Sequence, residues 1–301
     1  MNTKKPQIYA ESALHGDGYD WNQYELSILG DISVFVPVKI FDNGLHTKPL
    51  VYKTPASGFL IYSPGALLRN DKGGVPVDWE EVVKKKRIHL EGLSRLYERR
   101  FLAPFVYMDK IAESLGKQTL ITIPGMGCGQ FAGPFRGNMA SYLQEAIYRF
   151  LTKHIRLFQN IKVVYFDPFD ECENKRTQIE HLTFLTKPLR KGNTNKGQLS
   201  KVTDFQDTND SFSSLLLCSI VAWDHVSWPG NDFYIGSRAT DDGVKAAATN
   251  SMQVITGVAG SYKYSNNKYL PPEKYKFWKD VIYKNQLEIK VKDNVFVYPF
   301  Q

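Results

Sequence analysis

Apolar positions along the chain fall into two patterns. Short runs rich in β-branched residues predict buried strands at 26–41, 58–68, 119–123, 161–166 and 215–223. Longer stretches with apolar residues three and four positions apart predict helices at 79–101, 104–115, 138–154 and 241–256, and one more within 268–286. Strands that alternate with helices are typical of an α/β fold, in which helical layers cover a mostly parallel or mixed sheet.

Two segments depart from this pattern. Residues 1–25 are irregular, and we expect an N-terminal arm ahead of one domain at 26–301. Residues 181–214 are polar and broken by proline and glycine, so we expect an insertion or a mobile loop there. With 301 residues, 43% of them hydrophobic, the chain is long enough for one large domain.

Charge and cysteine content narrow the class of protein. The net charge of +7 favours acidic partners such as nucleotides, nucleic acid or acidic protein surfaces. Residues 84–100 carry part of this excess and predict an amphipathic helix with a basic, solvated face; without a zinc-finger, KH or RNP motif, nucleic acid is not the expected partner. The sequence has no apolar run of membrane-spanning length and no apolar leader, so we expect no membrane span and no secretory signal. Three widely spaced cysteines indicate free thiols in a reducing, cytoplasmic compartment.

A glycine-rich loop follows the strand predicted at 119–123. Backbone N–H groups of such a loop, ahead of a helix, form a concave site for phosphate or diphosphate. The candidate ligand-binding residues here are Gly125, Gly127, Cys128, Gly129, Gln130 and Phe131, with Arg136 close behind. The Walker pattern is absent. Residues 127–132 formally match the dinucleotide pattern GxGxxA, although Asp167 follows Gly127 by 40 residues instead of about 20. A tight turn without a ligand is the third interpretation.

An acidic segment at 223–252 is the second candidate site. It contains Asp224, Asp232, Asp241 and Asp242, beside Gly230, Asn231 and Arg238. A buried loop carboxylate is costly unless something pairs with it, so four of them predict a site that holds hydroxyl groups or a cation. The alternative is a solvated loop whose aspartates cap the following helix.

The two segments together resemble parts of a macrodomain. The stretch TLITIPGMGCGQFAG, then LQEAIYRFL, then IKVVYFD resembles the half whose glycine loop cradles the diphosphate of ADP-ribose, and NDFYIGSRATDDGVKAAATNSM resembles the loop that wraps the distal ribose. The order of these loops is the reverse of the common one. The resemblance therefore implies a three-layer α/β/α macrodomain-like mixed sheet, divergent or circularly permuted, with an N-terminal extension. Residues 30–33, GDIS, resemble a macrodomain opening in which the aspartate, here Asp31, contacts adenine.

Among macrodomains, PGNDFYIGSRATDDG is most similar to divergent effector macrodomains of Legionella. These resemble poly(ADP-ribose) glycohydrolases and remove ADP-ribose from arginine. The resemblance implies an ADP-ribosyl hydrolase acting on a mono-ADP-ribosylated protein, with ubiquitin as one candidate. It implies ADP-ribose as the ligand, no cofactor and no metal, and the host cytosol as location for a secreted effector. Two rival functions stay open: a non-catalytic ADP-ribose reader and an NAD-dependent oxidoreductase.

The resemblance also implies roles for individual residues. The functional carboxylates are expected at Asp224, Asp232 and Asp242, with Asp241 as the alternative to Asp242. Asp232 would position the ribose or the attacking water, Asp242 would bind ribose hydroxyls from a helix N-terminus, and Asp224 would pair with the guanidinium of the leaving group. Phe169 or Phe166 would stack on adenine. Arg238 would close over the diphosphate or neutralise the aspartates.

Overall fold

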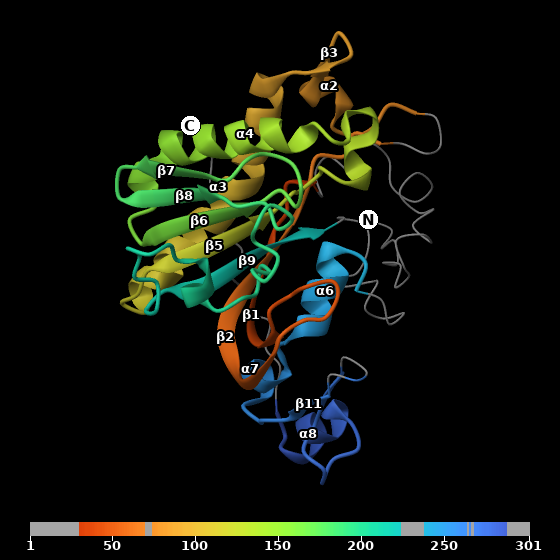
Figure 1. The fold of residues 1–301 in the computed structure, drawn as a ribbon. Coiled ribbons are helices and arrows are strands. Elements are labelled where there is room, and N and C mark those ends of the chain that lie inside the picture. Colours follow the sequence, from red (N-terminus) through yellow and green to blue (C-terminus); the bar gives the residue numbers. More distant parts are fainter. Residues whose placement is uncertain (1–29, 70–73, 224–237, 264, 266–267, 288–301) are drawn as a thin grey trace.

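The computed structural model describes residues 30–69, 74–223, 238–263, 265 and 268–287. They are built around an eight-stranded mixed sheet with the strand order β10-β1-β2-β9-β5-β6-β8-β7 (Figure 1). Its strands are β1 (Val34–Asp42), β2 (Val51–Pro64), β5 (Thr119–Pro124), β6 (Ile161–Asp167), β7 (Lys175–Ile179), β8 (Leu182–Thr186), β9 (Leu216–Trp223) and β10 (Thr249–Asn250). The five central strands from β2 to β8 are mutually parallel, whereas β1 and β7 are antiparallel to their neighbours.

Helical layers cover both faces of this sheet, as the sequence predicts. Helices α3 (Leu90–Ser114) and α4 (Met139–His154) pack on one face, while α6 (Asp241–Ala248) and the chain from residue 187 to 215 cover the other (Figure 1). Alternation along β5 explains the division, because Ile121 and Ile123 enter the core beneath α3 and α4 while Leu120 enters the opposite core. The predicted α/β class and three-layer α/β/α arrangement are therefore confirmed.

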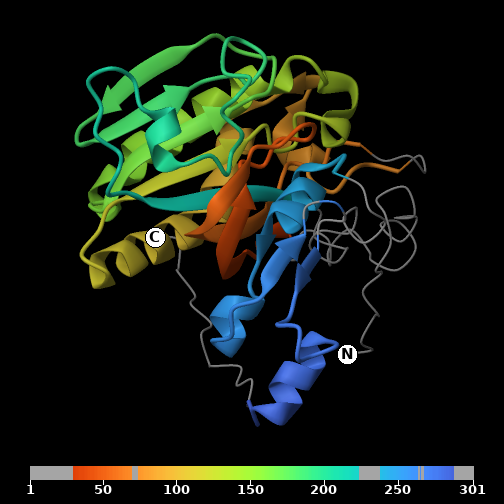
Figure 2. The ribbon, with the colours of Figure 1, turned by 60° about the horizontal axis from the view of Figure 1, so that its bottom comes forward.

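Smaller elements complete the described part of the chain. They are α2 (Trp79–Val82), β3 (Val83–Lys84), β4 (Arg87–Ile88), η3 (Gln130–Phe135), η4 (Ile155–Leu157), η5 (Val202–Phe205), α7 (Met252–Thr256), β11 (Ser261–Lys263), β12 (Lys268–Leu270) and α8 (Trp278–Lys284). The C-terminal elements, drawn in blue, lie beyond the β1–β2 side of the sheet in both ribbon views (Figure 2). Tyr262 and Tyr269 join them to the sheet by stacking on Phe41, with ring centroids 4.5 and 5.0 Å away.

The strands predicted at 119–123, 161–166 and 215–223 and the helix at 138–154 are confirmed, and the strands predicted at 26–41 and 58–68 are confirmed over 34–41 and 58–64. The prediction of two helices at 79–101 and 104–115 is wrong in its division of the chain, because the long helix begins only at residue 90 and has no break between 101 and 104. The chain forms the short helix α2 and then the β3–β4 hairpin, with Lys85 and Lys86 both at positive φ in its turn. A single helix, α3, then runs through Pro104. A proline costs a helix one hydrogen bond; here Phe101 and Phe105 on either side of it are fully buried, so tertiary packing holds the helix together.

Two further predictions need correction. The helix expected at 241–256 is divided into α6 and α7, because residues 249 and 250 leave the helix to pair with β1 as β10. The segment 181–214 is not all loop. Its first residues form β8, a completely buried strand of the sheet, and β7 precedes it. From residue 187 onward the chain is largely irregular, but it packs Leu199, Phe205 and Phe212 into the core.

The basic, solvated face predicted for 84–100 is also wrong at its C-terminal end. Arg100 is almost completely buried and donates to both carboxylate oxygens of Asp78 at 3.0 Å. Arg99 forms a two-bond pair with Glu81 at 2.7 and 2.8 Å, and its Nε lies 3.2 Å from Asp31. These arginines therefore hold the structure together instead of offering positive charge to a partner.

Candidate functional site

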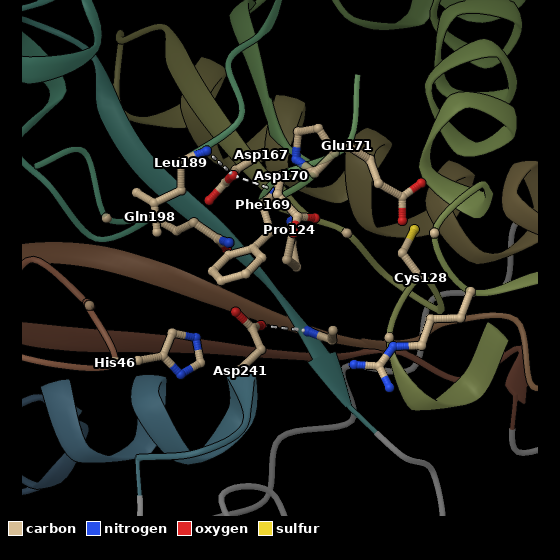
Figure 3. A pocket seen from close by; sticks show the side chains of 18 residues that line it. His46, Pro124, Cys128, Asp167, Phe169, Asp170, Glu171, Leu189, Gln198 and Asp241 are labelled. Carbon is tan, nitrogen blue, oxygen red and sulfur yellow. Dashed lines mark hydrogen bonds between the residues drawn. The ribbon is translucent and has the colours of Figure 1, made fainter. Parts of the chain in front are cut away.

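A pocket of about 430 Å³ opens at the carboxyl ends of β5, β6 and β9 (Figure 3). In open sheets with parallel strands, ligands bind at this end, where the loops after neighbouring strands diverge. The pocket is lined by Gly44, His46, Pro124, Gly125, Cys128, Gly129, Arg136, Gly137, Asp167, Pro168, Phe169, Asp170, Glu171, Leu189, Gly197, Gln198, Ala222 and Asp241. Both segments singled out in the sequence contribute to it.

The glycine loop contributes only some of its predicted residues to the pocket wall. Gly125, Cys128 and Gly129 line the pocket. Gly127 does not; it has φ +68°, and a Cβ there would lie 2.8 Å from the backbone nitrogen of Ala66. The glycine at 127 is therefore required by packing against the chain after β2, whatever ligand binds.

Gln130 and Phe131 also lie outside the pocket lining. The Gln130 side chain accepts a hydrogen bond from Arg69 at 2.9 Å, and the backbone oxygen of Phe131 accepts one from the Leu68 nitrogen at 2.8 Å. Both residues thus tie the start of η3 to the chain after β2. Of the predicted loop residues, Gly125, Cys128 and Gly129 line the cavity, whereas Gly127, Gln130 and Phe131 hold the loop against the chain after β2.

Cys128 is a neutral part of the wall. Its thiol lies 3.6 Å from the carbonyl oxygen of Met126. Burial raises the pKa of this thiol well above its usual value, and the nearby Glu171 and Cys172 raise it further. The nucleophilic form of cysteine is the thiolate, so this side chain is not an activated nucleophile.

Asp167 marks the end of β6 and organises the loop after it. The carboxylate accepts hydrogen bonds from the backbone nitrogens of Phe169 at 2.9 Å and Leu189 at 2.8 Å. Burial raises the pKa of Asp167; the negative charge of Asp241 also raises it, while the backbone hydrogen bonds oppose the change. Asp167 thereby joins two walls of the pocket and faces a second carboxylate across it.

The two candidate adenine-stacking residues lie in different environments. Phe166 is fully buried in the core beneath α3 and α4. Phe169 lies in the pocket with φ +64° and is 41% exposed, and the guanidinium of Arg190 sits 4.5 Å from its ring centroid. Only Phe169 offers an aromatic face to a ligand.

The structure separates the adjacent aspartates that the sequence left as alternatives. Asp241, the first residue of α6, lines the pocket with its side chain 19% exposed. Its Oδ2 accepts hydrogen bonds from the Ala222 nitrogen at 2.9 Å and from Lys245 Nζ at 3.0 Å. Asp242 is 5% exposed and is not part of the lining; its Oδ1 accepts from the Thr240 hydroxyl at 2.6 Å and from the Gly243 nitrogen at 2.9 Å. Asp241 therefore faces the cavity, while Asp242 belongs to the N-terminal turn of the helix.

Arg238 stabilises the wall next to the pocket. Its guanidinium donates to the two carboxylate oxygens of buried Asp42 at 2.9 and 3.2 Å and to the Leu45 carbonyl oxygen at 3.1 Å. The backbone oxygen of Arg238 lies 2.9 Å from Nδ1 of His46, which does line the pocket. A carbonyl oxygen can only accept, so Nδ1 carries the hydrogen.

Several lining residues were missed by the sequence analysis. His46 stands alone in the loop after β1, and Gln198 lies in a stretch assigned to an insertion. Asp170 and Glu171 follow β6, and Glu171 accepts a hydrogen bond from the Ala140 nitrogen at 2.9 Å, at the start of α4. The first turn of this helix therefore already binds a carboxylate of the chain itself. A polar run directly after a buried strand, DPFDE, was the available signal.

Four predicted site residues, Asp224, Gly230, Asn231 and Asp232, lie outside the described residues and stay predictions. Asp31 is described, but it pairs with Arg99 and is not part of the pocket lining. Within the described ranges, no group of three or more His, Cys, Asp or Glu side chains is arranged to hold a metal ion. None of the helices in those ranges has the length and apolar character needed to cross a membrane.

A sequence model of the family described as "Macrodomain effector MavL" matches residues 1–275. No curated protein matches the chain.

Proposed function

The chain belongs to the MavL family of macrodomain effectors, and from that premise we propose that its pocket binds ADP-ribose and that the protein is an ADP-ribosyl hydrolase. Membership of a macrodomain family supports binding or hydrolysis of ADP-ribose as the class of function. The observation that carries the proposal is the position of Asp241. Its carboxylate accepts hydrogen bonds from the Ala222 nitrogen, near the end of β9, and from Lys245, and it lines the pocket.

The pocket offers complementary surfaces for each part of ADP-ribose. Phe169 presents an exposed ring on which adenine can stack, because flat aromatic faces attract one another. Gly129 has open space around it, so its backbone can approach a diphosphate closely, and Arg136 adds positive charge at the same wall. In the proposed pose the distal ribose lies at Asp241, which lines the same pocket.

A carboxylate at the distal ribose suits hydrolysis of a glycosidic bond. The bond from C1″ to the leaving nitrogen breaks through a transition state with positive charge on the sugar, which a nearby carboxylate stabilises. Water then forms the new bond to C1″, one of its protons is lost, and the leaving nitrogen ends protonated. In this proposal Asp241 stabilises the sugar and orients the water. Asp232 and Asp224 stay proposed partners in that step.

The charge of the pocket favours arginine as the modified residue. Four carboxylates line the pocket, from Asp167, Asp170, Glu171 and Asp241, against the cationic Arg136 and the titratable His46. A guanidinium donates paired hydrogen bonds to carboxylates, so a substrate with arginine-linked ADP-ribose is the proposed class. The target is proposed to be an ADP-ribosylated protein, with ubiquitin as one candidate.

Titration calorimetry with ADP-ribose, NAD and AMP, followed by release of ADP-ribose from an arginine-modified peptide, tests the proposal. We expect ADP-ribose to bind more tightly than NAD and AMP, and the peptide to lose its label. Binding without release would make the protein a reader and overturn the hydrolase. Preference for NAD would favour the dinucleotide-dependent enzyme, and no binding at all would overturn the proposed ligand.

A further inference from the structure

Among the lysines that the structure describes, Lys245 is unusual because its ammonium group is buried. The side chain on α6 is 1% exposed, although lysine is almost never fully buried unless it is paired. Its Nζ donates to Oδ2 of Asp241 at 3.0 Å, to Oε1 of Gln198 at 2.7 Å, and to the carbonyl oxygen of Ile220. An ammonium group has three donors, so each of them has an acceptor inside the protein.

The three acceptors come from separate parts of the chain that meet at the pocket. Asp241 begins α6, Gln198 lies in the irregular stretch after β8, and Ile220 is in β9. The side chains of Asp241 and Gln198 point into the pocket (Figure 3), whereas Lys245 is not part of its lining. Lys245 therefore touches the cavity through these two side chains and does not itself line it.

Two donors fix the orientation of the Asp241 carboxylate. Lys245 and the Ala222 nitrogen both donate to Oδ2. A carboxylate anchored through one oxygen keeps a single rotamer, and Oδ1 is then the oxygen left for a ligand. Catalytic groups must be held within a fraction of an ångström of their working geometry, and buried neighbours of this kind supply that restraint.

We propose that Lys245 is a positioning residue of the ADP-ribosyl hydrolase, which holds Asp241 and Gln198 in the arrangement that meets the distal ribose. The inference rests on the proposed function. The titratable groups that face the ammonium are Asp241 on its own helix, Asp167 on β6 and Cys218 on β9. Burial lowers the pKa of Lys245, and the two aspartates oppose that change. One ammonium thus balances the two carboxylates on opposite walls of the pocket.

The test compares Lys245→Met, Lys245→Arg and a control, Asp109→Ala. Asp109 is a buried carboxylate on α3 that accepts a hydrogen bond from the Asn160 nitrogen at 2.6 Å. Asn160 directly precedes β6, so this contact lies at the opposite end of that strand from the pocket. We expect Lys245→Met to lower kcat about tenfold to a hundredfold, as removal of supporting hydrogen-bond partners does at other sites. Its KM should change little, because loss of a restraint that matters only in the transition state lowers kcat and kcat/KM equally. Lys245→Arg, which keeps the charge, should recover part of the rate.

Asp109→Ala should lower the melting temperature while leaving kcat and KM unchanged. A Lys245→Met enzyme with wild-type kcat would overturn the role of Lys245, as would an equal loss of kcat in Asp109→Ala. Wild-type turnover of arginine-linked ADP-ribose reports on the proposed function separately: if it is absent, both proposals fail.

If Lys245→Met does not fold, the wild-type protein still gives the answer. The ¹⁵N resonance of the Lys245 ammonium, followed by NMR during addition of ADP-ribose, should shift when the ligand meets Asp241 and Gln198. An unchanged resonance at saturating ADP-ribose would overturn the inference.

Discussion

Two buried ion pairs in this molecule share their chemistry and differ in what they serve. Arg100 and Lys245 are each 1% exposed, and each pairs with an aspartate at 3.0 Å. Asp78, the partner of Arg100, is 5% exposed, and Arg100 also donates to the carbonyl oxygens of Pro64 and Gly65. Asp241, the partner of Lys245, is 19% exposed and lines the pocket.

The difference shows how a buried charge can support a fold or a site. In the Arg100–Asp78 pair, the hydrogen bonds of Arg100 go to Asp78 and to the backbone of the chain after β2, so the pair holds that part of the chain in place. The glycine loop packs against the same part of the chain, because a Cβ on Gly65 would lie 2.2 Å from the Gly127 nitrogen. The Lys245–Asp241 pair satisfies one carboxylate oxygen and leaves the other toward the cavity. Since burial of an unpaired charge is costly, both pairs must stay intact, but only the second presents a charged group to a ligand.

The largest expected effect comes from breaking the first pair. Arg100→Met leaves the Asp78 carboxylate buried without its cation, and removal of one partner of a buried pair costs about 3–5 kcal/mol of unfolding free energy. Urea denaturation followed by fluorescence measures this change. A loss of less than about 1 kcal/mol, as for solvent-exposed ion pairs, would mean that the Arg100–Asp78 pair does not behave as a buried ion pair and cannot be compared with the Lys245–Asp241 pair.

The next prediction distinguishes a glycine that the fold requires from a glycine that contacts the ligand, both in the glycine loop. Gly127→Ala forces a residue with a Cβ into positive φ and against Ala66, so we expect a loss of about 1–3 kcal/mol of unfolding free energy. Gly129→Ala meets nothing within 4 Å and should change stability by less than about 0.5 kcal/mol, yet it should weaken ADP-ribose binding because Gly129 lines the pocket. Thermal unfolding and calorimetry on both variants check the contrast, and equal stability losses would contradict it.

A smaller effect should appear in the pH dependence of stability. Burial lowers the pKa of Lys245 below the ordinary lysine value of 10.5, so between the two values the unfolded chain binds more protons than the folded one. The Lys245 contribution to stability therefore increases as pH rises toward 10.5, and Lys245→Met removes this increase. The test measures the unfolding free energies of wild type and variant at pH 7 and pH 9.5. The value for wild type minus that for the variant should be larger at pH 9.5, and a smaller difference at pH 9.5 would contradict the prediction.

The smallest expected effect concerns the carboxylate on the opposite wall. Because burial raises the pKa of Asp167, the folded chain holds this proton more tightly, and its contribution to stability is full in acid and is lost as pH rises through the folded pKa. Asp167→Asn keeps an oxygen for the Phe169 and Leu189 nitrogens and does not titrate. The stability of wild type relative to this variant should therefore fall between pH 4 and pH 7, as measured by thermal unfolding at both values. If wild type instead gains stability relative to the variant between pH 4 and pH 7, the hydrogen bonds to Asp167 affect its pKa more than burial does.

Strands and layers were predictable because they depend on local runs of apolar residues. Ile121 and Ile123 alternate with Leu120 in sequence as they do across the sheet. The errors arose where distant contacts overruled local preference. Pro104 continues a helix because its neighbours are buried, and residues 249 and 250 leave a helix to pair with β1.

The site was predictable only as far as its residues cluster in the chain. The strand-to-helix glycine loop and the aspartates before the Ala-rich helix pointed to Gly125, Gly129 and Asp241, all of which line the pocket. His46 and Gln198 reach the same cavity from segments far apart in sequence, so no local spacing could indicate them. The structure was also needed to choose Asp241 over Asp242 as the pocket residue, because two adjacent aspartates at the start of a helix differ only in the direction in which their side chains point.

The most direct test of the account is hydrolysis of an arginine-linked ADP-ribosyl peptide by wild type and by Asp241→Ala, with ADP-ribose binding measured for both. The account predicts turnover by wild type and a loss of kcat of about a hundredfold or more in the variant, the size seen when a transition-state electrostatic partner is removed. Equal kcat in the two proteins would contradict the central role of the carboxylate that Lys245 holds in the pocket.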